Sequence, residues 1–482
     1  MRVATTCITA AMALLWTATE ATSIPRRRSG TPALKVMGMS TERRAISDPL
    51  GHDRIRRRGT VEASLSNQET LYFANLTIGT PPQSLRLHVD TGSSDLWVNS
   101  ASSRLCLSSS KPCDFAGTYA ANSSSSYEYI SSIFNISYVD GSGAQGDYVS
   151  DVVTVGSTRV DRLQFGIGYS STSTQGILGI GYELNEMQVG RAGLKPYRNL
   201  PTRLVEQGVI SSPAYSLWLN DLQATTGNIL FGGVDTEKFQ PPLYTVPMQQ
   251  NGGIFAEFLI TLTSVQYKSG EATQAMGENM ALAVLLDSGS SLTYLPDAVV
   301  QRIYQAVGAQ FDSNEGATYV PCSLADDRTR MLNFTFSSPV TISVPMSELV
   351  LELVTSSGRR PSFRNGGAAC LFGIASAGQG TNVLGDTFLR SAYVVYDLEN
   401  HAVSLAQSKL NVARSNVVEI GKGQGAVPSA TAVQNPVAAT AGLSRGAGRG
   451  VNNNSAASGG VLPPRAAALL ALVAAVGFAA LA

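Results

Sequence analysis

The sequence predicts a mostly β protein built from two similar lobes. Short apolar runs recur along most of the chain, separated by Gly, Pro, Ser and Asn, which is typical of strands joined by turns. Helical windows are few and short. One pattern, an apolar run followed by Asp, a hydroxyl residue, Gly and Ser, occurs twice, and such a duplication indicates two equivalent halves.

The first 58 residues have the composition of a leader. Residues 1–23 combine a basic start, a short apolar core and small residues suitable for cleavage, as in a secretory signal peptide. Residues 24–58 are rich in arginine and end in Arg57-Arg58, which predicts a propeptide removed by a protease that cleaves after paired basic residues. The mature chain then begins near Gly59.

Charge is distributed unevenly, although the formal net charge of the chain is zero. Residues 24–58 contain ten Lys or Arg and three Asp or Glu, whereas residues 59–454 contain 23 and 31. A basic leader and an acidic body favour electrostatic docking of the propeptide and argue against nucleic acid as a partner. The arginine clusters could equally be processing sites alone, and both interpretations stay open.

The first lobe is assigned to residues 59–245. It contains a predicted hairpin whose turn is Asp140-Gly141, because Asp-Gly is a strong signal for a tight turn between two strands. Clear strands are expected over residues 72–79, 134–139, 148–155 and 229–232.

The second lobe is assigned to residues 246–410. The boundary is placed where Pro and Gly cluster, between Phe239 and Phe255. The chain offers two helix candidates: residues 200–207 in the first lobe and 297–308 in the second, the latter with Pro296 just before it as a start signal.

The repeated pattern extends beyond the two aspartates. Residues 87–94 read LHVDTGSS and residues 285–291 read LLDSGSS. Each copy is followed downstream by two apolar residues and a glycine, at residues 177–179 and 383–385. Both halves therefore run in the same order, and we expect the fold to bring Asp90 and Asp287 together.

Five cysteines constrain the chain. Cys7 lies in the signal peptide, and the other four allow three pairings. Their order along the chain favours one bond in each lobe, Cys106–Cys113 and Cys322–Cys370. The three histidines are scattered and no CxxC occurs, so no metal site is expected.

The C-terminal part changes composition. Residues 411–460 are rich in Ala, Gly, Ser and Asn, which indicates a flexible stalk. Residues 461–482 end in an apolar tail preceded by small residues and a short spacer, as in a removable signal for a GPI anchor. A transmembrane helix is the competing interpretation. The candidate attachment residues are Asn454, Ser455 and Ser458.

Sequons for N-linked glycan support the secretory route, although such short motifs also occur by chance. They lie at Asn75, Asn122, Asn135, Asn333 and Asn453.

Two carboxyl groups held at one site provide acid–base chemistry. They cannot both ionise at low cost, so one is a base for a water molecule and the other an acid that polarises a carbonyl oxygen. Gly92 and Gly289 would let the backbone turn beneath each carboxyl group. Hydroxyl groups have two expected roles: those of Thr91 and Ser288 bond across the lobe junction, and those of Ser93 and Ser290 bond the outer carboxyl oxygens.

On these motifs the chain resembles the pepsin family of aspartic endopeptidases, over roughly residues 70–410. The resemblance implies the pepsin-like bilobal fold, with Asp90 and Asp287 as a catalytic pair that shares a proton, as is well known for aspartic proteases. It implies an acidic pH optimum, protein and peptide substrates, no cofactor and a monomer. It also implies a hairpin flap over the cleft, in which Tyr138 bonds to Trp97.

The signal, the dibasic leader, the stalk and the anchor-like tail together resemble the fungal yapsin-type proteases of the cell surface. That resemblance implies action at the plasma membrane or cell wall. It also implies that Asp140, with Gly141 and Ser142 beside it in the flap, helps accept Lys or Arg at the cleavage site. The chain departs from the family at Val139, where Gly commonly follows the flap tyrosine. The alternative function is an inactive pepsin-like binding or structural protein of the cell surface.

Overall fold

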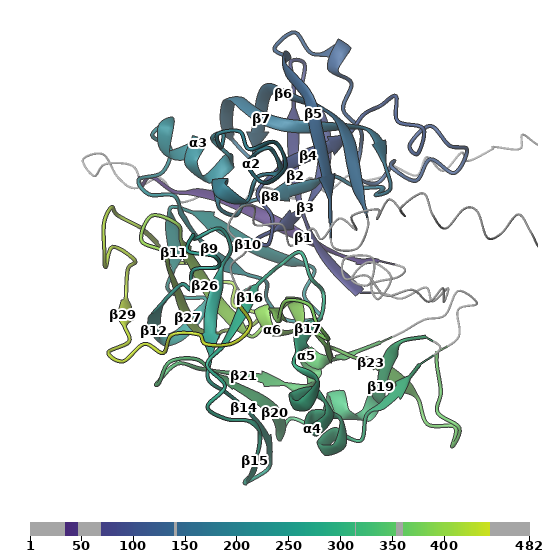
Figure 1. Ribbon diagram of the computed structural model, residues 1–482, viewed down its shortest axis with the longest axis vertical. Helices are drawn as coiled ribbons and strands as arrows, with labels where there is room; N and C mark the ends of the chain where they lie inside the picture. The colour runs from purple at the N-terminus through teal and green to yellow at the C-terminus, as the bar shows by residue number, and fades with distance from the viewer. Residues whose placement is uncertain (1–33, 47–68, 139–141, 314, 353–359, 444–482) are drawn as a thin grey trace, which may run out of the picture. The chain divides into compact units, whose positions relative to one another are not determined.

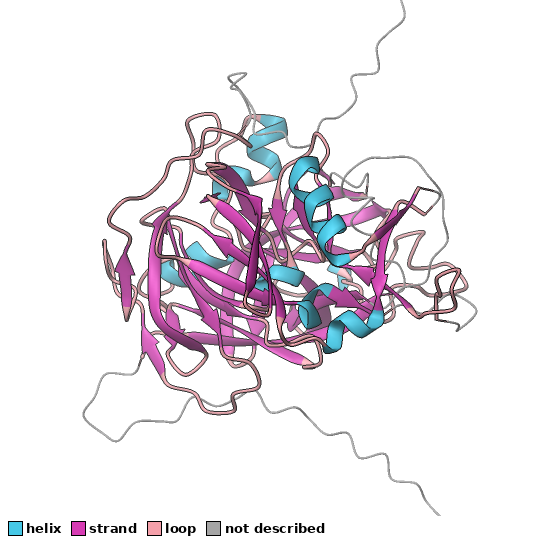
Figure 2. Cartoon of the chain, turned by 90° about the horizontal axis from the view of Figure 1, so that it is seen from below, coloured by secondary structure: helices cyan, strands magenta, loops and turns pink. Residues whose placement is uncertain are grey.

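A computed structural model describes residues 34–46, 69–138, 142–313, 315–352 and 360–443. Strands dominate these residues and the helices are short, as Figure 2 shows. Two β lobes are present, so the predicted fold class is confirmed. Both the predicted signal peptide, residues 1–23, and the tail 461–482 lie outside the described residues.

A large sheet runs from the first lobe into the region shared by both lobes, and its strands can be followed in Figure 1. The first lobe contributes β2 (Glu69–Ile78), β3 (Gln83–Asp90), β4 (Leu96–Asn99), β5 (Glu128–Ser137), β6 (Gly143–Val155), β7 (Thr158–Ser171) and β8 (Ile177–Gly179). The sheet continues through β1 (Met37–Ile46), β10 (Thr226–Phe231), β9 (Ala214–Trp218), β26 (Ala392–Asp397), β27 (Ala402–Ser408), β12 (Phe239–Pro247) and β29 (Ala430–Ala432).

The second lobe holds three smaller sheets. The first contains β13 (Leu259–Leu262), β16 (Leu282–Leu286), β25 (Val383–Leu384), β17 (Thr293–Leu295) and β24 (Ile374–Ser376). The second contains β15 (Ala272–Gly277), β14 (Ser264–Ser269), β20 (Arg330–Thr335) and β21 (Thr341–Pro345). The third contains β18 (Gln310–Asp312), β19 (Ala317–Pro321), β23 (Ala369–Phe372) and β22 (Val350–Leu351). Separately, β11 (Gly233–Asp235) pairs with β28 (Val417–Glu419).

Helices fill the corners between the sheets. They are α2 (Met187–Ala192), α3 (Leu200–Glu206), α4 (Asp297–Val307), α5 (Met346–Leu349) and α6 (Asp386–Leu389), with 3-10 turns η1 (Ala121–Ser123), η2 (Glu183–Asn185) and η3 (Cys322–Asp326). Both predicted helices are confirmed. In α4, Pro296 precedes the first turn and Gly308 ends the helix in the left-handed region, at φ 70°.

The sequence repeat corresponds to a structural repeat. In the first lobe β3 runs parallel to β8, β8 antiparallel to β4, and β4 parallel to β7. In the second lobe β16, β25, β17 and β24 pair in the same order and the same directions. The apolar-apolar-Gly segments are β8 and β25, so each lies beside the strand that leads to its aspartate.

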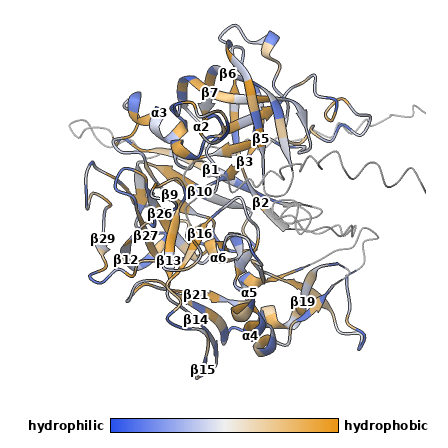
Figure 3. Ribbon diagram, viewed as in Figure 1, coloured by the Kyte–Doolittle hydropathy of each residue, from blue (hydrophilic) through white to orange (hydrophobic). Residues whose placement is uncertain are grey.

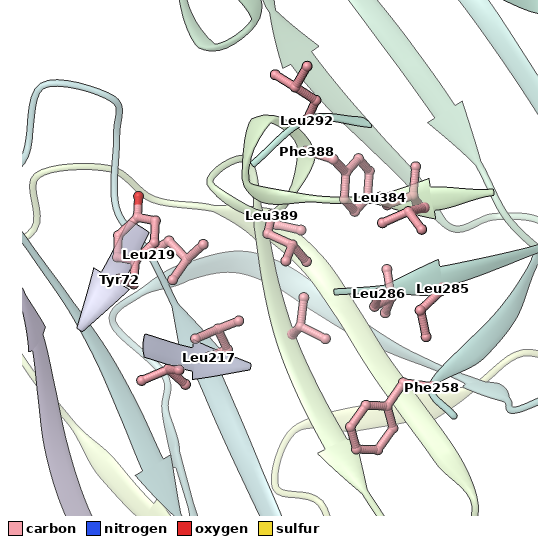
Figure 4. Packing of buried hydrophobic residues seen from close by; sticks show 14 of the residues in the cluster. Tyr72, Leu217, Leu219, Phe258, Leu285, Leu286, Leu292, Leu384, Phe388 and Leu389 are labelled. Carbon is pink, nitrogen blue, oxygen red and sulfur yellow. The ribbon is translucent and has the colours of Figure 1, made fainter. Parts of the chain in front are cut away.

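The strands are held together by a core that extends through both lobes. Figure 3 shows hydrophobic residues, in orange, recurring along the strands. Figure 4 shows part of this core, in which Leu285 and Leu286 of β16 lie near Phe258 and Leu384. Burial of this kind is the main favourable contribution to folding.

Three segments are arranged in ways that the sequence did not indicate. The strand β1 comes from the predicted propeptide, yet it lies inside the large sheet between β10 and β2. The predicted lobe boundary, between residues 245 and 246, falls within β12, because this strand continues to Pro247. Over this stretch β12 pairs with β27.

The third segment is the beginning of the predicted stalk. Residues 411–443 contact the lobes through β28 and β29. Ile420, Val427 and Val433 are buried there. The part of the predicted stalk that the structure describes, residues 411–443, is therefore held against the lobes.

Candidate active site

Asp90 is the last residue of β3, and Asp287 follows directly after β16. The two carboxyl groups are held in the same way. The Gly92 amide donates to Oδ1 of Asp90 at 2.8 Å, and the Ser93 hydroxyl donates to Oδ2 at 2.6 Å.

In the second loop the Gly289 amide donates to Oδ1 of Asp287 at 2.8 Å, and the Ser290 hydroxyl donates to Oδ2 at 2.7 Å. Each carboxyl group thus accepts one backbone and one side-chain hydrogen bond. Both aspartates are buried, with exposed fractions of 0% and 5%.

Thr91 and Ser288 join the two loops across the lobe junction by four hydrogen bonds. The Thr91 amide donates to the Ser288 hydroxyl at 3.2 Å, and the Ser288 amide donates to the Thr91 hydroxyl at 3.0 Å. In turn the Thr91 hydroxyl donates to the Leu286 carbonyl and the Ser288 hydroxyl to the Val89 carbonyl, both at 3.0 Å. Because all these groups are buried, losing one would leave a buried polar group unsatisfied.

Gly92 marks how closely the two loops approach. A Cβ atom at this position would lie 2.6 Å from Oδ1 of Asp287 and 3.1 Å from Oδ2. The backbone amide of the same glycine bonds to Asp90. A single residue therefore lies against both carboxyl groups, which places them at one site.

Backbone hydrogen bonds join the two aspartates to the apolar-apolar-Gly segments or to the residue that follows them. The Ile180 amide donates to the Asp90 carbonyl at 3.0 Å, and the Asp287 amide donates to the Leu384 carbonyl at 3.2 Å. A Cβ atom on Gly385 would lie 2.3 Å from the Ser290 carbonyl oxygen, so only glycine allows this approach.

Two tyrosines near the pair were not anticipated from the sequence. Tyr215 of β9 and Tyr396 of β26 stack with ring centroids 5.0 Å apart, and both are fully buried. Burial raises the pKa of each phenol, and the charges of Asp90 near Tyr215 and of Asp287 near Tyr396 add to the effect. Tyr215 lies 125 residues after Asp90 in the sequence, and Tyr396 lies 109 residues after Asp287. No local motif therefore identifies the two tyrosines.

A second buried cluster surrounds Asp95, five residues after Asp90. Its carboxyl group accepts hydrogen bonds from the hydroxyls of Tyr148 and Tyr197, at 2.7 and 3.0 Å, and from the Met187 amide at 2.8 Å. Burial raises the pKa of Asp95. The neighbouring Glu186 is also buried, and burial raises its pKa to about 10.

The predicted flap is only partly described. Tyr138 follows β5, and its hydroxyl accepts a hydrogen bond from the Trp97 indole at 2.6 Å. The Tyr138 amide donates to the Ser142 carbonyl at 2.8 Å, which closes the base of the hairpin turn. Asp140 and Gly141 lie outside the described residues.

The predicted disulfides and four of the predicted sequons lie within the described residues. The disulfides Cys106–Cys113 and Cys322–Cys370 are confirmed, with Cα atoms 5.1 and 5.0 Å apart. Four sequons are described: Asn75 and Asn122 are exposed, and Asn135 and Asn333 are half-buried. The anchor candidates Asn454, Ser455 and Ser458 and the sequon at Asn453 lie outside the described part.

The residues that the structure describes lack two kinds of feature. They contain no group of three or more His, Cys, Asp or Glu that could hold a metal ion. No helix among them has the length and apolar character needed to cross a membrane.

Known proteins resemble this chain in sequence and in fold. The family model for eukaryotic aspartyl proteases matches residues 71–408. A probable aspartic-type endopeptidase, opsB, of Aspergillus oryzae is 53% identical over 88% of this chain and 86% of its own length. Secreted aspartic protease 3 of Candida albicans is 38% identical over 76% of this chain and 86% of its own length. The crystal structure of an aspartic proteinase from Irpex lacteus superposes with a TM-score of 0.57 at 21% identity, covering 79% of this chain and all of that one.

Proposed function

This chain belongs to the eukaryotic aspartyl protease family and is an aspartic-type endopeptidase, and we propose that Asp90 and Asp287 are its catalytic pair. The observation that carries the proposal is the matched pair of loops, in which each carboxyl group is held by a glycine amide and a serine hydroxyl. The proximity of Gly92 to both carboxyl groups supports a shared site.

The reaction follows from two carboxyl groups that share one proton. The ionised carboxylate removes a proton from a water molecule as the water oxygen attacks the peptide carbonyl carbon. The protonated carboxyl group gives its proton to the carbonyl oxygen, which forms a tetrahedral gem-diol. Transfer of a proton to the amide nitrogen then breaks the C–N bond and releases an acid and an amine.

We propose an acidic working pH. Like charges at one site favour a singly protonated pair, which is lost as pH rises. Buried carboxyl groups elsewhere support the same conclusion: desolvation raises the pKa of Asp95, Glu186 and Asp397, so the folded state favours their neutral forms.

We further propose that the enzyme is secreted as a proform and acts at the cell surface or wall. The leader and the name of its Candida albicans relative, a secreted protease, support secretion, and the two disulfides suit an oxidising compartment. The tail 461–482 supports a GPI anchor. Residues 24–58 would act as the propeptide, and the seat of β1 within the sheet supports a stable proform.

We also propose a preference for basic residues at the cleavage site. An acidic side chain at Asp140 in the flap would favour Lys or Arg beside the cleaved bond. Replacing Asp140 by Thr should reduce cleavage after basic residues more than cleavage after Leu or Phe, measured on a peptide library. An unchanged ratio would remove Asp140 from this role.

The catalytic pair is tested by Asp90→Asn and Asp287→Asn, each assayed on a denatured protein near pH 4. We expect kcat to fall about 10²–10⁴-fold in each variant, the usual contribution of a positioned acid or base. Asp161→Asn is the matched control, because Asp161 is exposed in an ion pair with Arg159. Activity that survives either dyad substitution, or that pepstatin does not inhibit, contradicts the proposal.

A further inference from the structure

A cavity of about 880 Å³ lies on the outer face of the β5–β6 hairpin, away from the Asp pair. Successive residues of a strand point to opposite faces, so Phe134 and Ile136 of β5 enter the core while Ile133 and Asn135 face outward. Arg104 and Leu105, which come directly before the loop closed by Cys106–Cys113, also line the cavity. None of the residues lining this cavity belongs to the loops of Asp90 or Asp287.

Large apolar side chains are exposed around this cavity. Ile133 and Tyr169 line it with exposed fractions of 43% and 40%. Outside the lining itself, nearby residues of the chain are also exposed: Tyr129 and Ile130 of β5 at 54% and 42%, and Leu107 in the disulfide loop at 68%. Grouped apolar side chains on a protein surface mark a place that another group covers.

The same wall also carries an organised polar network. The Asp147 carboxylate accepts a hydrogen bond from the Ser132 hydroxyl at 2.6 Å and another from the Tyr169 hydroxyl at 3.0 Å. The Tyr129 and Ser132 hydroxyls lie 3.0 Å apart. A ring surface beside fixed carboxylate and hydroxyl groups suits a sugar, which has an apolar face and a rim of hydroxyl donors.

The occupant is suggested by the chain itself. Asn135 lines the cavity, is half-buried, and begins the sequon Asn135-Ile136-Ser137. We propose that the first sugars of an N-linked glycan on Asn135 occupy this cavity and cover its apolar wall. The proposal rests on the secretion proposed above, because the glycan is added only along that route.

The position of the glycan has a consequence for the hairpin. Asn135 pairs with Gln145 across β5 and β6, and both residues line the cavity. Tyr138, which bonds to Trp97, lies three residues after Asn135. A glycan seated against β5, β6 and β7 would therefore restrain the hairpin from its outer side, opposite the face that meets the core.

The first experiment measures the seat directly, on protein secreted by a fungal host. Glycopeptide mass spectrometry gives the occupancy of each sequon, and an endoglycosidase is then applied to the native protein. We expect release from Asn135 to be about tenfold slower than release from Asn122, which is exposed, and the two rates to become equal after denaturation. Equal rates in the native protein would overturn the proposal.

Failure can be assigned to its source. If Asn75 and Asn122 carry glycan and Asn135 does not, the inference fails and secretion stands. If the host does not export the chain at all, the secretion proposal fails, and the inference fails with it.

The second experiment measures restraint of the hairpin by amide hydrogen exchange. Asn135→Gln should speed exchange in β5 and β6 by about threefold or more, while Asn122→Gln leaves it unchanged. Ile133→Ser should speed exchange in the glycosylated protein but add little in the Asn135→Gln background, because the two act through one contact. Additive effects, or protection that appears only when a denatured protein substrate is added, would contradict a glycan seat.

Discussion

Gly92 is the residue that contacts both carboxyl groups of the proposed catalytic pair. Its amide bonds to Asp90, and its Cα leaves no room for a side chain beside Asp287. The motif alone explains why a turn follows each aspartate. It does not show that the glycine of one loop touches the carboxyl group of the other, because that contact forms only when the lobes meet.

Gly92→Ala tests this contact. We expect kcat/KM to fall about 100-fold or more, since a shift of about 1 Å in a reacting group can have that effect. Gly421→Ala is the matched control, because its Cβ would lie 3.6 Å from the nearest heavy atom. A Gly92→Ala enzyme with normal activity would mean that the carboxyl groups are not held where the loops place them.

Residues of the site differ in how far the sequence could predict them. The hydroxyls of Thr91 and Ser288 were expected to bond across the junction, and they do. Tyr215 and Tyr396 could not be expected, because each reaches the pair from a distant strand. Asp95 resembles a surface polar residue in the sequence, and only the tertiary fold shows that two tyrosines bury it.

At the scale of elements, β1 has the most unusual position. It pairs through Met37 to Glu42 with β10 and through Thr41 to Ile46 with β2, so it is an interior strand of the large sheet. Its arginines indicated a processed leader, but they did not indicate a strand with buried residues such as Met39, which is 3% exposed.

Met39→Ala should lower the free energy of unfolding of the proform by about 2–4 kcal/mol, as for other buried methionines. The same denaturant titration on the form that begins near Gly59 should show no difference, because that form lacks the residue. Ser40→Ala is the control, since Ser40 is exposed and its replacement should change stability by less than about 0.5 kcal/mol. If Met39→Ala leaves the free energy of unfolding of the proform unchanged, β1 contributes little to the stability of the proform.

The composition of residues 411–443 misled the prediction at the same scale. Few aromatic residues and many small ones indicated a flexible stalk. A few apolar residues are sufficient to hold this segment against the lobes. Ile420 and Val427 enter a small core with Phe239, and Val433 joins the main core. Average composition does not detect such isolated anchors.

At the scale of the whole molecule, buried acids set how stability depends on pH. Glu186 is 1% exposed, and its Oε2 accepts a hydrogen bond from the Tyr197 amide at 2.8 Å. Its Oε1 has no hydrogen-bond partner among the described residues. Burial raises the pKa of this carboxyl group to about 10, with smaller contributions from Asp95 and Glu183 that also raise it.

Glu186→Gln should therefore flatten the pH dependence of stability. In the unfolded chain this carboxyl group has its ordinary pKa of 4.5, whereas burial in the folded protein raises the pKa to about 10. Its contribution to stability is thus fully present below about pH 4 and decreases as pH rises, by up to about 1.4 kcal/mol per pH unit. Denaturant unfolding between pH 4 and pH 8 measures the slope.

The exposed Glu271 provides the control, since Glu271→Gln should leave the slope as it is in the unaltered enzyme. If Glu186→Gln keeps the full slope, then the other buried acids, Asp95 and Asp397, account for it instead.

The reciprocal hydrogen bonds of Thr91 and Ser288 also bear on when the enzyme can first act. The ribosome makes the chain from one end, so Asp90 emerges 197 residues before Asp287. Until the second loop has been made, the Thr91 amide lacks its acceptor, and Asp90 lacks the carboxyl group that we propose as its acid–base partner. If Asp90 and Asp287 are the catalytic pair, as proposed, a chain that lacks the second loop cannot yet cleave its neighbours, and activity begins only after both loops have been made and joined.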